Sequence, residues 1–224
     1  MDRMTAPGKL RLTAGGFLLT AILVILSYEF LDERIALWID RLLRSHGLHS
    51  LYTSRIPNLL LPAVLVLSGV MWALYLREVR RGERDGPSTF FLLTGIALPA
   101  TYVVKLALKH VFGRMGPRAW LENPTDPSFH WFQGGGDLTG FPSGHMAVFI
   151  TLAVACGLFF PKARAACLAG IVALGVALIA TGQHFLSDVI AGGYIGWVVL
   201  AGTDRGLTLL SLIISNRSVR SKWG

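Results

Sequence analysis

Long apolar blocks separated by short polar segments run through most of this sequence. Six blocks approach the ~20 predominantly apolar residues that a helix needs to cross the hydrocarbon core of a bilayer. They cover residues 15–31, 57–76, 89–108, 142–160, 165–181 and 187–203. The pattern predicts an all-α, polytopic membrane protein built as a bundle of six transmembrane helices.

The segment between the first two blocks, residues 33–44, is amphipathic instead of continuously apolar. A helix through this segment would carry on one broad side the residues Ile35, Leu37, Trp38, Leu42 and Leu43. Arginines and an aspartate occupy other positions, a pattern typical of a helix that lies in the membrane interface. After the last block, residues 206–214 form a short apolar stretch that we expect near the cytoplasmic surface.

The composition agrees with the block pattern. Hydrophobic residues make up 53% and charged residues 15% of the 224 residues, which argues against a water-soluble domain. The net charge of +8 would suggest a nucleic-acid partner in a soluble protein. Because Lys and Arg gather at the cytoplasmic ends of membrane helices, we expect no nucleic acid here. We predict a single membrane-embedded domain over residues 1–224, and we interpret Cys156 and Cys167 as small buried hydrophobic residues.

Lys and Arg are distributed unequally between the two sides of the predicted bundle. Assigning alternate connecting segments to alternate sides places thirteen on the side of both termini and eight on the other. Because cytoplasmic segments collect basic residues, both termini are predicted to be cytoplasmic. Residues 105–140 and 182–186 then share the extracytoplasmic side, and the short loops suit a bacterial inner membrane protein.

Three polar clusters interrupt the apolar pattern, and all three are predicted at the extracytoplasmic boundary. They are KHVFGRMGPR at 109–118, GFPSGH at 140–145 and GQHFLSD at 182–188. Segments far apart in the sequence would therefore converge on one face of the bundle. This convergence predicts a functional site more strongly than any one cluster does.

The GFPSGH cluster has the features of an anion site at the start of a helix. Pro142 suits a first helical turn, where the Ser143 and Gly144 N–H groups would lack helical acceptors. Such a terminus attracts a phosphate oxygen, and His145 beside it could donate a proton to a departing oxygen. The alternative is an N-cap serine followed by an incidental histidine.

Two further clusters supply candidate catalytic and phosphate-binding side chains. On a continuous helix, His184 and Asp188 would share a face, so the carboxylate could hold one imidazole nitrogen and leave the other free as nucleophile or base. The alternative is a pair of polar residues that cap a helix. Lys109, Arg114 and Arg118 would then be either a clamp for a phosphate or cations anchored at the membrane boundary.

With these motifs in place, the sequence resembles the type 2 phosphatidic acid phosphatase superfamily of integral membrane lipid phosphatases. The resemblance covers about residues 105–196, and PSGH matches fully. The family's signature begins with a Lys followed after six residues by Arg-Pro, but counting from Lys109 the arginine position holds Gly116. Its third motif begins with Ser-Arg, but these positions hold Ala177 and Leu178. Arg114 and Arg118 could each substitute for a missing arginine.

The resemblance implies a mechanism and a substrate class. His184 would attack phosphorus, Asp188 would orient it and His145 would protonate the leaving group. The groups implied to stabilise the phosphoryl oxygens are Lys109, Arg114, Ser143 and the Gly144 amide. No metal or other cofactor is implied, and the substrate would be a lipid phosphate or diphosphate such as undecaprenyl diphosphate, phosphatidylglycerophosphate, phosphatidic acid or lipid A. The alternatives are a lipid phosphotransferase and a non-catalytic lipid-binding or transport protein.

The segment 119–139 is too polar to span a membrane and rich in aromatic residues. We expect an extracytoplasmic loop over the site that grips the lipid and its headgroup, although a belt of aromatic anchors would have the same composition. His130 lies in this segment and is interpreted as a surface residue.

Overall fold

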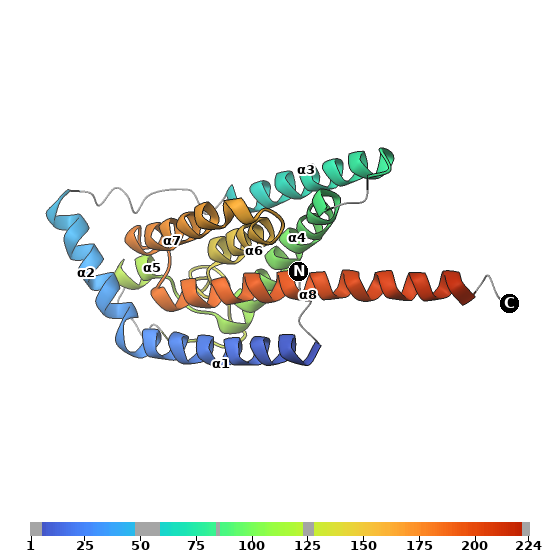
Figure 1. The fold of residues 1–224 in the computed structure, drawn as a ribbon. Helices are drawn as coiled ribbons and strands as arrows, with labels where there is room; N and C mark the ends of the chain where they lie inside the picture. Colours follow the sequence, from blue (N-terminus) through green and yellow to red (C-terminus); the bar gives the residue numbers. More distant parts are fainter. Residues whose placement is uncertain (1–5, 48–58, 84–85, 123–127, 221–224) are drawn as a thin grey trace.

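The fold is seen in a computed structural model, which describes residues 6–47, 59–83, 86–122 and 128–220 (Figure 1). The described chain consists of α-helices joined by turns and loops, with one 3₁₀ turn at Pro161–Ala163. The α-helices are α1 Ala6–Phe30, α2 Asp32–Ser45, α3 Leu60–Arg80, α4 Gly86–Phe112, α5 Pro117–Glu122, α6 Gly144–Phe159, α7 Arg164–Ala180 and α8 Leu186–Arg220.

Each apolar block of the sequence falls on a helix, although α1 begins nine residues before its block and α8 ends 17 residues after its block, so the all-α prediction is confirmed. Within the described residues, four helical segments are long and apolar enough to cross a membrane. Helices α1 and α2 make a fifth if this pair, bent by 55°, counts as one span. Helix α6 has only 16 residues. The count of six spans therefore remains a prediction. The start of the second block, at residues 57 and 58, lies outside the described residues.

The predicted amphipathic helix is α2, and the face that it packs against the bundle is not its most apolar side. Its buried residues are Asp32, Ala36, Ile39 and Leu43, whereas Leu37, Trp38 and Leu42 are exposed. Ala36 packs with Trp120 of α5 and with Phe185, which immediately precedes α8. The face against the bundle thus includes a carboxylate, which the apolar pattern did not reveal.

Two segments differ from the sequence prediction. The apolar stretch 206–214 is the continuation of α8, which runs unbroken for 35 residues because no proline interrupts it. The expected loop over residues 119–139 begins inside α5. Part of that loop, residues 123–127, lies outside the described residues.

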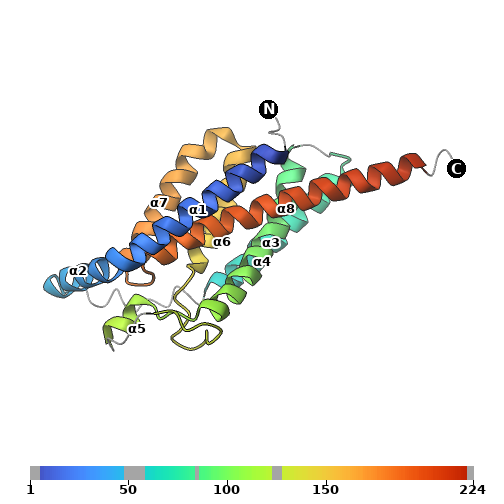
Figure 2. The same cartoon turned by 90° about the horizontal axis from the view of Figure 1, so that it is seen from below.

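The helices surround α8 and bring three helix ends together. Helix α8 packs against α1, α4 and α6, while α3 lies on α4 and α7 lies on α6. The C-terminal end of α4, the short α5 and the N-terminal ends of α6 and α8 gather at one end of the bundle (Figure 2). The start of α1 and the end of α8 lie at the opposite end (Figures 1 and 2). The three polar clusters therefore share one end, as predicted.

Two glycines of α8 allow it to approach α6 closely. A Cβ atom at Gly192 would lie too close to the carbonyl oxygen of Ser143, and one at Gly196 would lie too close to that of Ala147. Small residues four apart let helix backbones approach each other in membranes. This contact holds the start of α6 beside the start of α8. It therefore places the GFPSGH cluster next to the GQHFLSD cluster.

We expect Gly196→Ala to weaken this helix contact. The added methyl group must push the two backbones apart, which typically costs ~1–3 kcal/mol in a packed interior. The midpoint of thermal unfolding in detergent should fall by several degrees. Gly202→Ala is the matched control, because a Cβ atom there meets nothing within 4 Å. Equal midpoints for the two variants would contradict this account of the packing.

Candidate functional site

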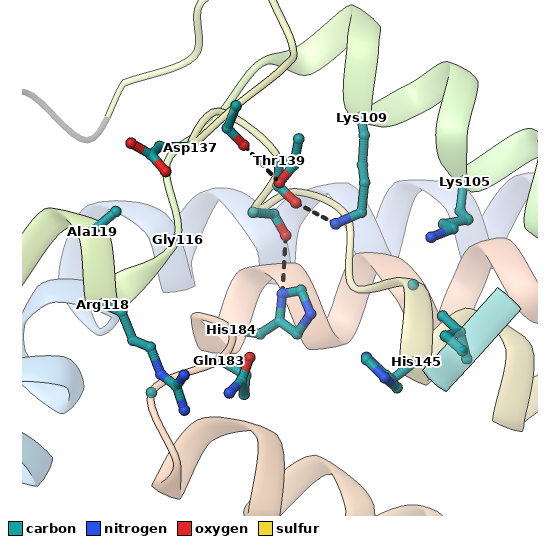
Figure 3. A pocket seen from close by; sticks show the side chains of 15 residues that line it. Lys105, Lys109, Gly116, Arg118, Ala119, Asp137, Thr139, His145, Gln183 and His184 are labelled. Carbon is teal, nitrogen blue, oxygen red and sulfur yellow. Dashed lines mark hydrogen bonds between the residues drawn. The ribbon is translucent and has the colours of Figure 1, made fainter. Parts of the chain in front are cut away.

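A cavity of about 330 Å³ opens where the three polar clusters meet (Figure 3). Helix α4, the segment before α6, the first turn of α6 and the turn between α7 and α8 all contribute to its wall. The polar side chains that line it are Lys105, Lys109, Arg118, Asp137, Thr139, His145, Gln183 and His184. Cations and imidazoles outnumber the single carboxylate, so the cavity suits an anion.

The two candidate catalytic histidines face the same space. His145 stands in the first turn of α6 and His184 in the turn that precedes α8, and their ring centroids are 6.5 Å apart. This separation leaves room for a tetrahedral group between the rings. The predicted convergence of the second and third clusters is confirmed.

The orientation of His184 differs from the expectation. Its Nδ1 lies 2.9 Å from the carbonyl oxygen of Gly140 and 3.6 Å from Oδ2 of Asp188. Because a carbonyl can only accept, Nδ1 carries the proton and Nε2 keeps its lone pair. In Figure 3 this second nitrogen turns toward the side of the cavity where His145 lies. A backbone carbonyl, more than the Asp188 carboxylate, fixes the ring.

The Gly140 carbonyl is itself held by the folded segment that closes this end of the bundle. The Gly140 N–H donates to the Arg114 carbonyl at 2.6 Å. Earlier in the segment, the N–H groups of residues 130, 132 and 134 donate to carbonyls of residues 113, 111 and 110 at the end of α4. The expected loop over the site is therefore bonded to α4 along its backbone. Its aromatic rings form a cluster of Phe112, Phe129, Trp131 and Phe141.

The start of α6 offers fewer free donors than predicted. Ser143 is the N-cap: its Oγ accepts from the Met146 N–H, and its own N–H donates to the Asp188 carbonyl at 3.0 Å. Ser143 is fully buried and does not line the cavity, so its predicted contact with phosphate finds no support. Gly144 does line the cavity. Its N–H has no helical acceptor, because it belongs to the first turn.

Arg114 was expected to contact phosphate, but in the structure it is buried and does not line the cavity. Its side chain is 1% exposed and is absent from the cavity wall. Nη1 donates to Ser187 Oγ at 2.7 Å and to Asp188 Oδ1 at 2.9 Å, and Nη2 donates to Asp32 Oδ2 at 2.8 Å. A guanidinium can be buried only when its charge and its donors are paired, and these two carboxylates pair them.

Asp32 is the partner that sequence reasoning missed. It lies at the start of α2, and its carboxylate also accepts from the N–H and Oγ of Ser187. Asp188 completes the group, since its Oδ2 accepts from the Phe185 N–H at 2.8 Å and so caps α8. We call Asp32, Arg114, Ser187 and Asp188 the buried network. It joins α2, the segment after α4 and the start of α8, and it reaches His184 through Asp188.

The remaining cations lie on two sides of the cavity. Lys109, from α4, donates to the carbonyl of Thr139. Arg118, on the other side of His184 in Figure 3, donates to the carbonyl of Thr181 at 3.0 Å and lies beside the Gln183 amide. Both predicted residues thus line the cavity. Lys105 also lines it and was missed, although its position four residues before Lys109 places both on one helix face.

No arrangement for a metal is found in the part of the chain that the structure describes. There, no three His, Cys, Asp or Glu side chains are grouped so that they could hold an ion. The cavity wall offers two imidazoles, the cations around them and the Gly144 N–H.

Comparisons with known proteins give the family. The profile of the PAP2 superfamily matches residues 89–209, which is more than half of the chain. Lipid A 1-phosphatase of Rhizobium etli is 39% identical over 74 residues, 33% of this chain and 32% of that protein. The corresponding protein of Rhizobium johnstonii is 40% identical over 65 residues, 29% of this chain and 27% of that protein. These matches thus span about a third of the length of the curated relatives.

A solved structure with a similar course of the chain is that of a transmembrane PAP2-type phosphatidylglycerolphosphate phosphatase from Bacillus subtilis. It shares 19% sequence identity at a TM-score of 0.43, over 86% of this chain and 94% of that chain. The family assignment depends instead on the sequence profile, whose matched range contains the cavity residues from Lys105 to His184. The chain is a member of the PAP2 superfamily.

Proposed function

We propose that this protein is an integral membrane phosphatase that hydrolyses a lipid phosphate or diphosphate through a phosphohistidine intermediate. The observation that carries the proposal is the pair of imidazoles of His145 and His184 in one cavity lined by cations. Their ring centroids are 6.5 Å apart. This arrangement provides a nucleophile, a proton donor and charge compensation for one phosphoryl group.

In the first step, Nε2 of His184 attacks phosphorus. A P–N bond forms, the P–O bond to the lipid breaks, and His145 gives a proton to the departing oxygen. The Gly140 carbonyl accepts a hydrogen bond from Nδ1 and thereby keeps the attacking nitrogen unprotonated. Lys109, Arg118 and the Gly144 N–H compensate charge on the phosphoryl oxygens, where it accumulates during transfer.

In the second step, water hydrolyses the phosphohistidine. His145, now neutral, accepts a proton from the water as its oxygen bonds to phosphorus. The P–N bond breaks, orthophosphate leaves and His184 regains its lone pair. The buried network contributes through Asp188, which caps α8. The Oδ2 atom of Asp188 lies 3.6 Å from Nδ1 of His184 and favours the positive charge that develops on this ring.

We place the substrate at the extracytoplasmic face of a bacterial inner membrane. The support is the basic residues on the side of both termini, together with the position of the helix ends that carry the cavity residues, at the opposite end of the bundle (Figure 2). Candidate substrates are undecaprenyl diphosphate, phosphatidylglycerophosphate, phosphatidic acid and lipid A. The matched relatives named lipid A 1-phosphatase make a lipid A-type sugar phosphate the first of these to test.

The proposal is tested by release of free phosphate from a panel of these lipids, using purified protein in detergent. The scheme uses no metal ion, so activity should persist in the presence of a chelator. One free phosphate should appear for each phosphate ester lost. Loss of ester without free phosphate would instead indicate transfer to a second lipid, and inactivity toward the whole panel would refute the hydrolase.

We expect His145→Ala to slow hydrolysis in a way that depends on the leaving group. With a lipid alkoxide as leaving group, loss of the proton donor should lower turnover by ~10²–10⁴-fold. With para-nitrophenyl phosphate, whose phenolate departs without a proton, the loss should be much smaller. The measurement is the ratio of kcat/KM for the two substrates, in the variant and in the wild type. Equal losses on both would show that His145 does not act as the acid.

A further inference from the structure

Lys105 is a buried cation at the wall of the cavity, and no ion pair or hydrogen-bond acceptor is found for it among the described residues. Its side chain is 7% exposed, and it lines the cavity together with Lys109 and His145. We infer that Lys105 binds the phosphoryl group directly, as a phosphate ligand that the motifs of the sequence do not include. The inference rests on the proposed function for its substrate, but the contact with phosphate can be tested separately.

In the described part of the structure, no negative charge is paired with Lys105. Among the described residues, no carboxylate oxygen lies within 4.0 Å of its Nζ, and no hydrogen-bond acceptor is found for it. The contact that is present is the face of the Tyr102 ring, whose centroid lies 4.2 Å from Nζ. Asp137 also lines the cavity, but it is exposed and forms no ion pair with Lys105. A buried ammonium in this position calls for an anion.

The position of Lys105 relative to α6 strengthens this argument. A Cβ atom at residue 144 would lie 2.8 Å from Cδ of Lys105 and 3.3 Å from Nζ, so glycine at this position gives the ammonium its place beside the start of the helix. A helix N-terminus carries partial positive charge. An ammonium and a helix N-terminus repel each other unless an anion lies between them. A phosphate in the cavity would be stabilised by both at once.

The other cations near the site are already engaged. Arg114 is paired with two buried carboxylates, Arg118 donates to the Thr181 carbonyl, and Lys109 donates to the Thr139 carbonyl. An ammonium has three donors. In the described part of the chain, Lys105 is the cavity cation for which no such bond is found, and all three of its donors remain for a ligand.

The two positions where the family signature has an arginine hold Gly116 and Leu178 in this chain. Gly116 lines the cavity without a side chain, and Leu178 is buried in an apolar cluster with Met146 and Val189. The charge for the phosphoryl oxygens must therefore come from elsewhere in the wall. Figure 3 shows Lys105 and Lys109 extending from α4 into the cavity. Lys105 supplies this charge from a helix face that also holds Lys109.

The test is the affinity of the purified protein for inorganic phosphate, measured by calorimetry in detergent for the wild type and Lys105→Met. Loss of a charge-assisted hydrogen bond should weaken phosphate binding by ~10–100-fold. Lys162→Met is the matched control, because Lys162 is an exposed lysine in the 3₁₀ turn before α7, and its replacement should leave the affinity unchanged. Thermal unfolding of each variant is recorded in parallel.

The unfolding midpoint distinguishes a ligand contact from a structural role. Removing an unpaired buried cation should leave the midpoint of Lys105→Met equal to that of the wild type or higher. A lower midpoint together with weaker binding would assign Lys105 a structural role and overturn the inference. Should Lys105→Met fail to fold, Lys105→Gln provides the same comparison of affinities.

The outcomes separate this inference from the proposed function. If Lys105→Met binds phosphate within a factor of two of the wild type, the inference is wrong whatever the activity. If the wild type does not bind phosphate at all, the inference is also wrong. If phosphate binding depends on Lys105 but no lipid phosphate is hydrolysed, the inference holds and the hydrolase proposal fails.

Discussion

His184→Ala should abolish release of phosphate from every lipid that the wild-type protein hydrolyses. The substitution removes the side chain that forms a bond to phosphorus in the first step of the scheme, and loss of a catalytic nucleophile typically costs ~10⁴-fold or more in turnover. Free phosphate is measured over time with detergent-solubilised substrate and a chelator. His46→Ala is the control, since His46 is exposed at the end of α2 and its replacement should leave turnover unchanged.

A trapping experiment separates a nucleophile from a general base at the same position. Wild-type protein quenched in alkali during turnover of a labelled lipid phosphate should carry label, because a phosphohistidine survives base and is lost in acid. His184→Ala should carry none. Residual turnover of a tenth or more in His184→Ala, or active wild-type protein that never becomes labelled, would remove His184 from the role of nucleophile.

The helices could be predicted because a bilayer imposes a length on apolar segments. Each of the six blocks proved helical, and the blocks alternate in direction, so clusters at equivalent block ends had to meet. This reasoning brought His145 and His184 together without knowledge of any contact. It could not fix the span count, since α6 is short and α1 bends into α2.

The orientation of His184 could not be derived from its spacing to Asp188. The spacing argument assumed one helix, but Gly182 adopts a left-handed conformation with φ of 62° and ends α7. A glycine just after an apolar helix is a recognised stop signal and could have warned of the turn. His184 therefore stands in the turn before α8, where the Gly140 carbonyl reaches Nδ1.

The partners of the cations were the least predictable feature. A basic residue near a motif can face the ligand or a carboxylate, and only tertiary structure distinguishes these cases. Asp32 lies 82 residues from Arg114 in the sequence, at the start of a helix whose pattern suggested only an interfacial role. Lys105 was overlooked for the opposite reason, since a single lysine within an apolar block is usually interpreted as a boundary anchor.

Arg114→Met should destabilise the protein more than any other single change near the site. It leaves the carboxylates of Asp32 and Asp188 buried without a cation, and breaking a buried ion pair in this way typically costs ~3–5 kcal/mol. For a chain of this size, the midpoint of thermal unfolding should fall by on the order of 10 °C. Activity should be lost as well, because Asp188 of the buried network contacts His184.

Arg118→Met provides the contrast that assigns the two arginines different roles. Arg118 is partly buried, donates to the Thr181 carbonyl and lies beside the Gln183 amide, so its replacement leaves the ion pairs of the buried network in place. The unfolding midpoint of Arg118→Met should stay close to that of the wild type, while KM for the lipid phosphate should rise if the guanidinium compensates phosphoryl charge.

The unfolding midpoint of Arg114→Lys should lie between those of the wild type and Arg114→Met, because an ammonium keeps the charge but not the planar fork that reaches both carboxylates. A wild-type midpoint with a raised KM in Arg114→Met would mean that this guanidinium leaves its carboxylates to bind the substrate, and the buried network would then be part of the phosphate site.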